Sequence, residues 1–328
     1  MLIYAGIDEA GYGPLLGPLV VGRSVFALRD AEPDDAQGLP NLWDILNKAV
    51  CQKLSGRVGR IPVNDSKKLK TKAAGVKHLE MGVMSFCSVM QDTLPRPTDL
   101  GQWLDLLGET THHQRQVLPW YDGPWQSLPT ANTDAEINVA ANMLKHEMKD
   151  KAVKILDMGA AVVMEDRFNH MVANTRSKAS LSFTFVATHL DTIWKRWGKH
   201  HPQVVVDRQS GRTHYLNLLR QVFPDAQLTI ISESSKESHY QLQTPQRSMQ
   251  VRFLVDAEAA NMPVALASMV SKYTREVFMD RLNRWFISQQ PDLKPTAGYA
   301  QDGKRFLEDI EGLLKTLKID CNRLARQS

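Results

Sequence analysis

The chain has 328 residues, 23% charged and 43% hydrophobic, which excludes a disordered chain and fits a globular protein of one large or two small domains. No apolar run reaches the roughly 18 residues of a membrane-spanning helix, and we expect a cytoplasmic protein with no membrane partner and no cleaved leader. The net charge of +4 weakly indicates a polyanionic partner. The three cysteines lack the spacing of a disulfide framework or a zinc site.

The N-terminal stretch from Ile3 to Val21 is the most informative part of the sequence. An apolar segment runs into two adjacent carboxylates, Asp8 and Glu9, and a glycine-proline turn leads into a second apolar segment. This pattern predicts a strand, a tight turn and a returning strand. Neighbouring side chains on a strand point to opposite faces, so Glu9 reaches the same site as Asp8 only if the strand ends there. Alone, the pair also fits a solvated hairpin with two surface acids.

Two short helices are expected next. Residues 42–50 have apolar side chains at helical spacing. Asp65 and Ser66 precede the basic Lys67 and Lys68, which is the pattern of a helix N-cap and a solvated first turn.

Residues 92–135 differ in composition from the rest of the chain. They are rich in proline and in large aromatic residues, namely Pro95, Pro97, Pro119, Pro124, Pro129, Trp103, Trp120, Tyr121 and Trp125. Prolines at this density prevent regular elements, so we predict an irregular insertion with a short helix near residues 100–107. Its aromatic residues either stack on exposed bases as a platform or lid, or anchor the loop to the protein. His112 and His113 are too few for a metal site.

The middle of the chain returns to regular patterns. Residues 134–151 predict a helix and residues 160–164 a strand, and residues 186–197 are apolar at helical spacing. The alternation in residues 181–185 is a competing strand signal. Residues 171–220 carry eight Lys or Arg against two Asp, which indicates either a cationic surface for phosphate backbones or a solvated helix face.

The last third contains the remaining acids. Residues 204–207 read as a buried strand ending in Asp207, and ligands gather at the carboxyl ends of such strands. Residues 228–232 predict the next strand, and the segment 233–251 is polar and long. Small residues between 256 and 276 predict a helix packed closely on the sheet, with Lys272 and Arg275 one turn beyond Ser268. Residues 306–317 predict an amphipathic helix.

The string Ile-Asp-Glu-Ala-Gly-x-Gly-Pro-x-x-Gly-Pro, from Ile7 to Pro18, resembles the opening signature of ribonuclease HII, the bacterial and archaeal type 2 ribonuclease H. Three further blocks match that family in its order. They are the Asp-Ser-Lys-x-Leu string from Asp65, the apolar run ending in Asp207, and the string Ala-Ser-x-x-x-Lys-x-x-Arg-Glu that ends at Glu276. Gly298-Tyr299-Ala300 is a weaker match.

The resemblance implies a ribonuclease H-like α/β fold. Its mixed sheet has three antiparallel strands followed by parallel ones, with helices on both faces and a C-terminal helical portion. We expect a catalytic domain of residues 1–91 and 136–285, an insertion at 92–135, and an extension of the same domain at 286–328.

The resemblance also implies four catalytic and metal-binding acids, namely Asp8, Glu9, Asp207 and Glu258. Glu258 lies ten residues before Ser268, where the family has Asp, and Asp256 is the alternative two residues away. Four close carboxylates need compensating cations, and all-oxygen ligands suit Mg²⁺ or Mn²⁺. Two such ions support in-line phosphodiester hydrolysis.

The implied substrate is an RNA–DNA hybrid or duplex DNA with embedded ribonucleotides, cut 5′ of the ribonucleotide by a monomeric enzyme. The implied substrate contacts are Gly11, Tyr12, Gly13, Lys67, Ser268, Lys272, Arg275 and Tyr299. In this family the turn at residues 11–13 offers backbone groups to ribose 2′-hydroxyls.

Several positions depart from the family and describe a divergent member. Tyr12 replaces arginine, Arg208 replaces glycine, and Glu258 and Glu276 replace aspartate. The alternative is a nucleic-acid-binding protein on the same fold that no longer cuts. The acidic residues at all four positions favour an enzyme, because mutually repelling carboxylates serve no purpose in a decayed site. A phosphatase or transferase is a third reading.

Overall fold

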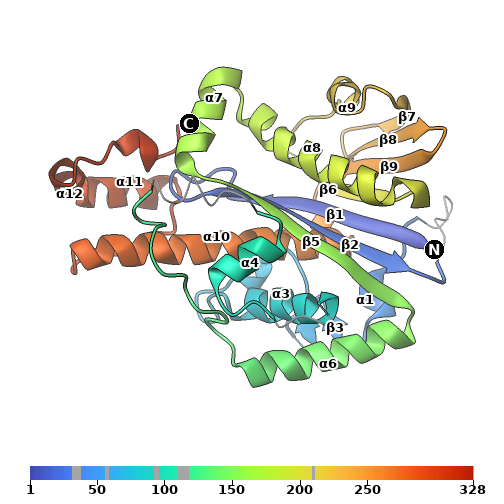
Figure 1. Ribbon diagram of the computed structural model, residues 1–328, viewed down its shortest axis with the longest axis horizontal. Coiled ribbons are helices and arrows are strands. Elements are labelled where there is room, and N and C mark those ends of the chain that lie inside the picture. Colours follow the sequence, from blue (N-terminus) through green and yellow to red (C-terminus); the bar gives the residue numbers. More distant parts are fainter. Residues whose placement is uncertain (32–37, 56–58, 92–95, 110–117, 209–210, 328) are drawn as a thin grey trace.

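The computed structural model describes residues 1–31, 38–55, 59–91, 96–109, 118–208 and 211–327. Within them, a seven-stranded mixed sheet has the order β5-β2-β1-β6-β9-β8-β7 (Figure 1). Its strands are β1 Leu2–Ala10, β2 Leu19–Leu28, β5 Val153–Val163, β6 Gln203–Asp207, β7 Gln227–Glu233, β8 Glu237–Thr244 and β9 Arg247–Leu254. A separate parallel pair consists of β3 Val50–Cys51 and β4 Ile61–Pro62.

The strand directions confirm the predicted fold class. β2 is antiparallel to both β1 and β5, whereas β6 is parallel to β1 and β9 is parallel to β6. The three antiparallel strands and the parallel β6 and β9 match the prediction, whereas β8, which is antiparallel to both β9 and β7, departs from it. Ile7 of β1 pairs with Val206 of β6, so the acids that follow these two residues lie side by side at one end of the sheet.

Helices cover both faces of the sheet (Figure 1). Those in the first part of the chain are α1 Leu42–Ile45, α2 Ser66–Leu69, α3 Lys77–Met90, α4 Leu100–Leu106, α6 Asp134–Asp150, α7 Glu165–Thr175 and α8 Lys178–Trp197. The later ones are α9 Leu216–Val222, α10 Met262–Gln289, α11 Ala300–Asp309 and α12 Glu311–Thr316. Short 3-10 turns are η1 Gly198–His200, η2 Ala257–Ala259 and η3 Cys321–Arg323. No helix of the described part is long and apolar enough to cross a membrane.

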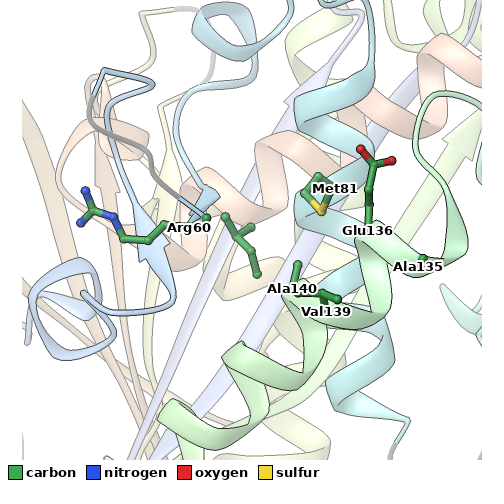
Figure 2. Close-up of a pocket in the computed structure, with 8 residues that line it drawn as sticks. Arg60, Met81, Ala135, Glu136, Val139 and Ala140 are labelled. Atoms are coloured by element: carbon green, nitrogen blue, oxygen red, sulfur yellow. The ribbon is translucent and has the colours of Figure 1, made fainter.

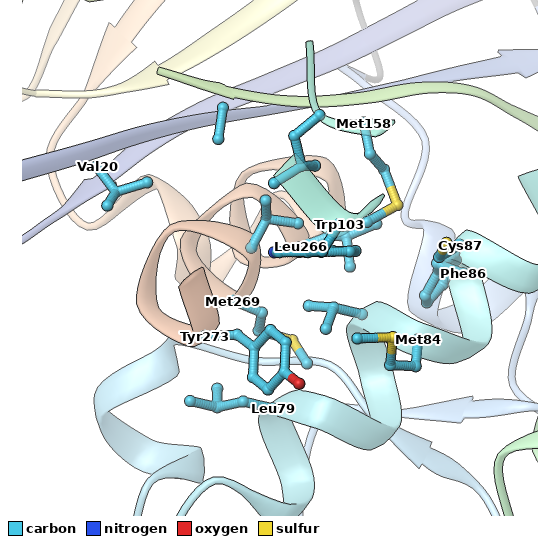
Figure 3. Packing of buried hydrophobic residues seen from close by; sticks show 14 of the residues in the cluster. Val20, Leu79, Met84, Phe86, Cys87, Trp103, Met158, Leu266, Met269 and Tyr273 are labelled. Atoms are coloured by element: carbon cyan, nitrogen blue, oxygen red, sulfur yellow. The ribbon is translucent and has the colours of Figure 1, made fainter. Parts of the chain in front are cut away.

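The alternation of side chains along β1 divides the interior into two cores. Leu2 and Tyr4 are buried in a first core with residues of α3, α4, α6 and α10, while Ile3, Ala5 and Ile7 are buried in a second core with residues of α8 and α9. Figure 3 shows the first core, where side chains from α3, α4 and α10 meet. β1 is therefore covered on both faces, as its nearly continuous apolar sequence requires.

Helix α10 lies directly against the sheet where β1 and β2 carry glycines. A Cβ atom at Gly6 would lie 2.2 Å from the backbone of Pro263, and one at Gly22 would lie 2.5 Å from Ser271 Oγ. The Ser271 hydroxyl donates to the Asp8 carbonyl oxygen over 3.0 Å. The predicted close packing of this helix is thus confirmed, and it fixes the end of β1.

The strand predicted at 228–232 is confirmed as β7, but the two strands that follow it were missed. The strand beside β6 is β9, whereas the predicted strand at 228–232 is β7, at the edge of the sheet. The segment 233–251, read only as polar, contains β8 and most of β9. The reason is burial: Val251 and Phe253 of β9 lie in the second core, while Ile230 and Ile231 of β7 are 45% and 47% exposed.

Other expectations were corrected at element boundaries. The helix predicted at 42–50 ends at Ile45, and Val50 begins β3. The strand predicted at 160–164 starts at Val153, the helix predicted at 306–317 is divided into α11 and α12, and residues 181–185 are helical within α8. Their strand-like alternation gives way because Leu181, Phe183 and Phe185 all face the second core from the helix.

The aromatic residues of the insertion anchor it. Trp103 in the predicted short helix, now α4, is buried and donates from Nε1 to Thr274 Oγ1 over 3.0 Å. Trp120 and Tyr121 are also buried, with the Tyr121 ring 5.2 Å from that of Phe278. These three side chains are therefore unavailable as a base-stacking platform. Pro95, His112 and His113 lie outside the described residues.

Candidate active site

The carboxyl ends of β1 and β6 open into one cavity, bordered by the turn after β1, the start of α2, η2 and α10. Its lining residues are Asp8, Glu9, Ala10, Gly11, Tyr12, Gly13, Pro14, Asp65, Ser66, Lys67, Asp207, Glu258, Ser268, Lys272 and Tyr299. The structure thus brings together all four predicted acids and every predicted substrate contact except Arg275. Asp65 and Ser66 also line the cavity, although the sequence was read there only as a helix N-cap.

Asp8 is the most deeply buried of the four acids, with 7% of its surface exposed. Its Oδ1 atom accepts the backbone N–H of Glu9 over 2.7 Å. Burial raises the pKa of Asp8 well above its ordinary value, and repulsion from Glu9 and Asp207 raises it further. A positive charge in this cavity would remove that repulsion.

Asp207 and Glu258 form the opposite side of the acid cluster. Burial, followed by repulsion from Glu258, raises the pKa of Asp207 to about 8. Asp207 Oδ1 accepts the backbone N–H of Ala257 over 3.0 Å, which ties β6 to η2. Glu258 Oε2 is buried with no hydrogen-bond partner among the described residues.

Of the two candidates for the fourth acid, only Glu258 lies at the cavity. Glu258 lines the cavity, whereas Asp256 is an exposed residue outside its lining, with a left-handed φ of 52°. The left-handed residue ends the extended chain after β9 and starts the η2 turn, and this turn directs Glu258 inward.

Two lysines lie among the acids. Lys67 follows Asp65, whose side chain caps α2 by accepting the Lys67 N–H over 2.9 Å. Burial lowers the pKa of Lys67, but attraction by Asp65, by Asp8 and by the other cavity acids raises it above its ordinary value. Lys272 is 7% exposed, and its Nζ lies 2.7 Å from Glu276 Oε1.

Glu276 holds Lys272 in place from outside the cavity. Its second carboxylate oxygen contacts Lys70 Nζ. Burial alone would raise the pKa of Glu276, but Lys272 and Lys70 hold it below its ordinary value. Lys272 Nζ also lies 3.4 Å from the hydroxyl of Tyr299, whose ring is 49% exposed.

The prediction that Arg275 contacts substrate is wrong, because its side chain is fully buried. Its Nη2 atom donates to the carbonyl oxygens of Leu16 and Ala297 over 3.0 and 3.2 Å. The guanidinium stem lies beneath the turn, where a Cβ at Gly11 would be 2.8 Å from Arg275 Cδ. Gly11 also has a left-handed φ of 88°, so both its backbone and its packing require glycine.

The remaining turn residues differ in their surroundings. Gly13 is exposed, with open space around its Cα, so its backbone is accessible. The Tyr12 ring is half-buried against the second core. The hydroxyls of Ser268 and Ser66 lie 3.0 Å apart, and a hydrogen bond from Ser268 to the Asp8 carboxylate lowers the otherwise raised pKa of Asp8.

The basic segment 171–220 is partly neutralised. Lys195 pairs with Asp191 over 2.6 Å, and Arg196 pairs with Asp157 over 2.9 Å. Arg208 donates to the carbonyl oxygen of Ser235 and so holds the turn between β7 and β8. These contacts fit the solvated and structural reading of this segment.

A different cavity lies between β4, α3 and α6, on the side of the first core (Figure 2). Its walls include the apolar Met81, Val139 and Ala140. Its charged groups already have partners, because Arg60 donates to the Asn47 carbonyl oxygen and Glu136 belongs to the capping box of α6. This cavity therefore lacks the clustered acids of the site at the sheet end.

The chain thus combines a seven-stranded mixed sheet with a cavity that Asp8, Glu9, Asp207 and Glu258 line at the end of its central strands. No protein-family model matches the chain, and no curated protein sequence matches it. Similar solved structures include the PCNA:RNase HII complex from Archaeoglobus fulgidus, at 15% identity over 99% of this chain and 94% of that chain, with a TM-score of 0.43. Others are RNase H3 from Aquifex aeolicus (13% identity, 98% and 71% covered, TM-score 0.40) and ribonuclease H2 from Pyrococcus horikoshii OT3 (15%, 98% and 92%, 0.39). Likeness at this level identifies neither a family nor an activity.

Proposed function

We propose that the chain is a metal-dependent endonuclease that cuts the RNA strand of RNA–DNA hybrids or cuts 5′ of ribonucleotides embedded in duplex DNA. The observation that carries the proposal is the convergence of Asp8, Glu9, Asp207 and Glu258 from three separate segments on one cavity. A surface hairpin would leave such acids solvated and apart. Burying them together raises the pKa of Asp8 and Asp207, a cost that a catalytic site explains.

The four acids are the residues that would hold Mg²⁺ or Mn²⁺. Their metal ligands would all be carboxylate oxygens. Glu258 Oε2 is buried without a partner among the described residues, which fits a hard cation as its missing partner. No group of three or more His, Cys, Asp or Glu in the described ranges is already arranged to hold a metal ion. Bound divalent ions supply the activation of water and the charge stabilisation of an in-line displacement, which leaves a 5′-phosphate and a 3′-hydroxyl.

The chain's own cations would bind and orient the substrate backbone. Lys67 and Lys272 line the same cavity as the acids, and they provide positive charge for phosphates. Lys272 is fixed between Glu276 and the Tyr299 hydroxyl, so its ammonium is positioned before substrate arrives. The exposed ring of Tyr299 offers a surface on which a nucleotide stacks.

Ribose recognition is assigned to the turn at residues 11–13. A backbone group at the open Gly13 reaches a 2′-hydroxyl without help from a side chain, and this hydroxyl distinguishes RNA from DNA. Tyr12 removes a cation that the resembling family has, but it leaves the backbone contacts in place. We therefore expect ribonucleotide preference to persist with weaker phosphate binding.

The test is cleavage of three labelled duplexes: a full RNA–DNA hybrid, DNA with a single ribonucleotide, and all-DNA, each with Mg²⁺ or Mn²⁺. We expect cutting of a ribonucleotide-containing duplex, no cutting of all-DNA, and loss of cutting in Asp8→Asn. The ratio between the first two duplexes identifies the preferred substrate. No cutting of any duplex, together with salt-sensitive binding, would instead support a non-catalytic nucleic-acid-binding protein.

A further inference from the structure

The turn after β1 continues past the cavity through Pro14 to Gly17, and distant parts of the chain hold its backbone. The N–H groups of Leu15 and Leu16 both donate to the Gly298 carbonyl oxygen, over 2.8 and 3.1 Å. The N–H of Gly17 donates to Glu165 Oε1 over 3.0 Å. These three donors are therefore satisfied from α7 and from the segment before α11.

The carbonyl side of the same turn is held by the C-terminal end of the chain. The Arg326 N–H donates to the Leu15 carbonyl oxygen over 2.8 Å, and a bridge joins Leu16 to Ala325. The Arg326 guanidinium donates to the Pro14 carbonyl oxygen from a position that is 3% exposed. A surface tail would not bury an arginine, so this contact is a built part of the fold.

The C-terminal end is itself fixed to α7, beside which it lies in Figure 1. The Asn169 side chain donates to the carbonyl oxygens of Asn322 and Ala325 over 2.6 and 2.8 Å and accepts the Gln327 N–H over 2.7 Å. The Arg326 guanidinium lies over the Phe168 ring, 4.5 Å from its centroid. One side chain, Asn169, therefore holds residues 322–327 in a single conformation.

Glu165 completes this arrangement from beneath. Its Oε1 atom accepts both the Gly17 N–H and the Tyr121 hydroxyl, the latter over 2.7 Å. Glu165 is fully buried, and it connects Gly17 of the turn to α7. Tyr121 comes from the insertion, so the insertion also supports the turn.

We propose that residues 322–327 form a clamp that positions the turn at residues 11–13 relative to Tyr299, with Arg326 as its main positioning residue. Gly298, which binds the turn, directly precedes Tyr299, so the clamp sets the distance between Tyr299 and the turn at residues 11–13. Asp8, Glu9 and Asp207 stand on β1 and β6, and Glu258 stands on η2, which Asp207 ties to β6, so we expect the acids to stay in place without the clamp. This inference rests on the proposed function for its kinetic consequence and on the contacts above for its structural one.

The test compares Arg326→Ala with the conservative Arg326→Lys, which keeps a donor for Pro14, and with Lys315→Ala, a matched loss of charge on exposed α12. We expect Arg326→Ala to lower kcat/KM about tenfold to a hundredfold, mainly through a higher KM, because the acids stay in place. Arg326→Lys recovers most of this loss, and Lys315→Ala has none. If Arg326 only stabilised the fold, Arg326→Ala would lower the Tm but would leave KM unchanged at temperatures below the Tm.

Amide hydrogen exchange of the peptide covering residues 11–18 provides a readout that needs no activity. We expect faster exchange there in Arg326→Ala and in Asn169→Ala, with unchanged exchange in β1. If Arg326→Ala does not fold, Asn169→Ala replaces it. This variant removes the hydrogen bonds that Asn169 makes to residues 322–327 and keeps the buried Arg326 side chain. Wild-type exchange and KM in both variants would overturn the clamp, whereas wild-type protein that cuts no duplex but shows the exchange changes would overturn only the proposed nuclease.

Discussion

Two groups of charged residues at the cavity differ in how well their charges are paired. The acidic wall consists of Asp8, Glu9, Asp207 and Glu258, and the lysine wall consists of Lys272, which lines the cavity, with Glu276 and Lys70 behind it. In the lysine wall, Lys272 and Lys70 each contact one oxygen of Glu276, so both lysines have an anionic partner within the chain. In the acidic wall, repulsion adds to burial in raising the pKa of Asp8 and Asp207. The lysine wall is stable as it stands, whereas the acidic wall needs protons or a cation. That difference is what a site that binds cations requires.

The largest expected effect is that of Asp8→Asn, which should lower activity and raise stability. Asp8→Asn keeps the acceptor for the Glu9 N–H but removes one repelling charge, so we expect cleavage to fall on the order of 10²-fold or more. The free energy of unfolding should rise, by about 1 kcal/mol, since repulsion is relieved. Single-turnover cleavage and urea unfolding measure the two effects, with Asp30→Asn as an exposed control. A destabilised Asp8→Asn would contradict this account of the wall.

The next effect is a pH dependence of stability in the absence of metal. The pKa of Asp207 is about 8 in the folded chain against an ordinary 3.8, so the folded state binds this proton more tightly than the unfolded state. Its stabilisation is complete below about pH 4 and is lost as the pH rises through 8, with a slope of at most about 1.4 kcal/mol per pH unit.

Urea unfolding across this pH range in EDTA measures the slope, and Asp207→Asn should reduce it. An equal slope in the variant would mean that Asp207 is ionised throughout and that the acids repel each other less than their burial indicates.

The smallest effect concerns the lysine wall. Glu276→Gln keeps the side-chain length but removes the negative charge that both Lys272 and Lys70 contact. We expect the free energy of unfolding to fall by about 1 to 3 kcal/mol. Because Lys272 is then less fixed, KM should rise several-fold with little change in kcat. Steady-state kinetics beside an exposed control, Glu308→Gln, tests this. A fall in kcat with constant KM would assign Glu276 to the chemical step.

Strand patterns point to Asp8, Glu9 and Asp207 because these acids stand at the ends of strong strand patterns, whereas Glu258 was predicted only from the resemblance to ribonuclease HII. The three valines before Asp207 identify a buried strand, and the glycine-rich string after Glu9 identifies a turn. β7 was predicted, but β8 was missed because half-buried strands of this kind mix polar and apolar residues. No local pattern reveals which of these strands pairs with β6.

Contacts that depend on side-chain packing between distant segments could not be predicted. Spacing on α10 gives Lys272 and Arg275 nearby faces, and only the turn that packs over the helix decides that Lys272 reaches the cavity while Arg275 is buried. The contact of Arg326 with Pro14 joins residues 312 positions apart, for which the sequence carries no signal.

The most direct test of the central claim is cleavage of the single-ribonucleotide duplex and the RNA–DNA hybrid by EDTA-treated protein as Mg²⁺ or Mn²⁺ is added back. We expect no cutting without metal, a saturable return of cutting with metal, and no return in Asp8→Asn or Asp207→Asn. Cutting that persists in EDTA, or that returns fully in either variant, would contradict a metal-dependent site built from these acids.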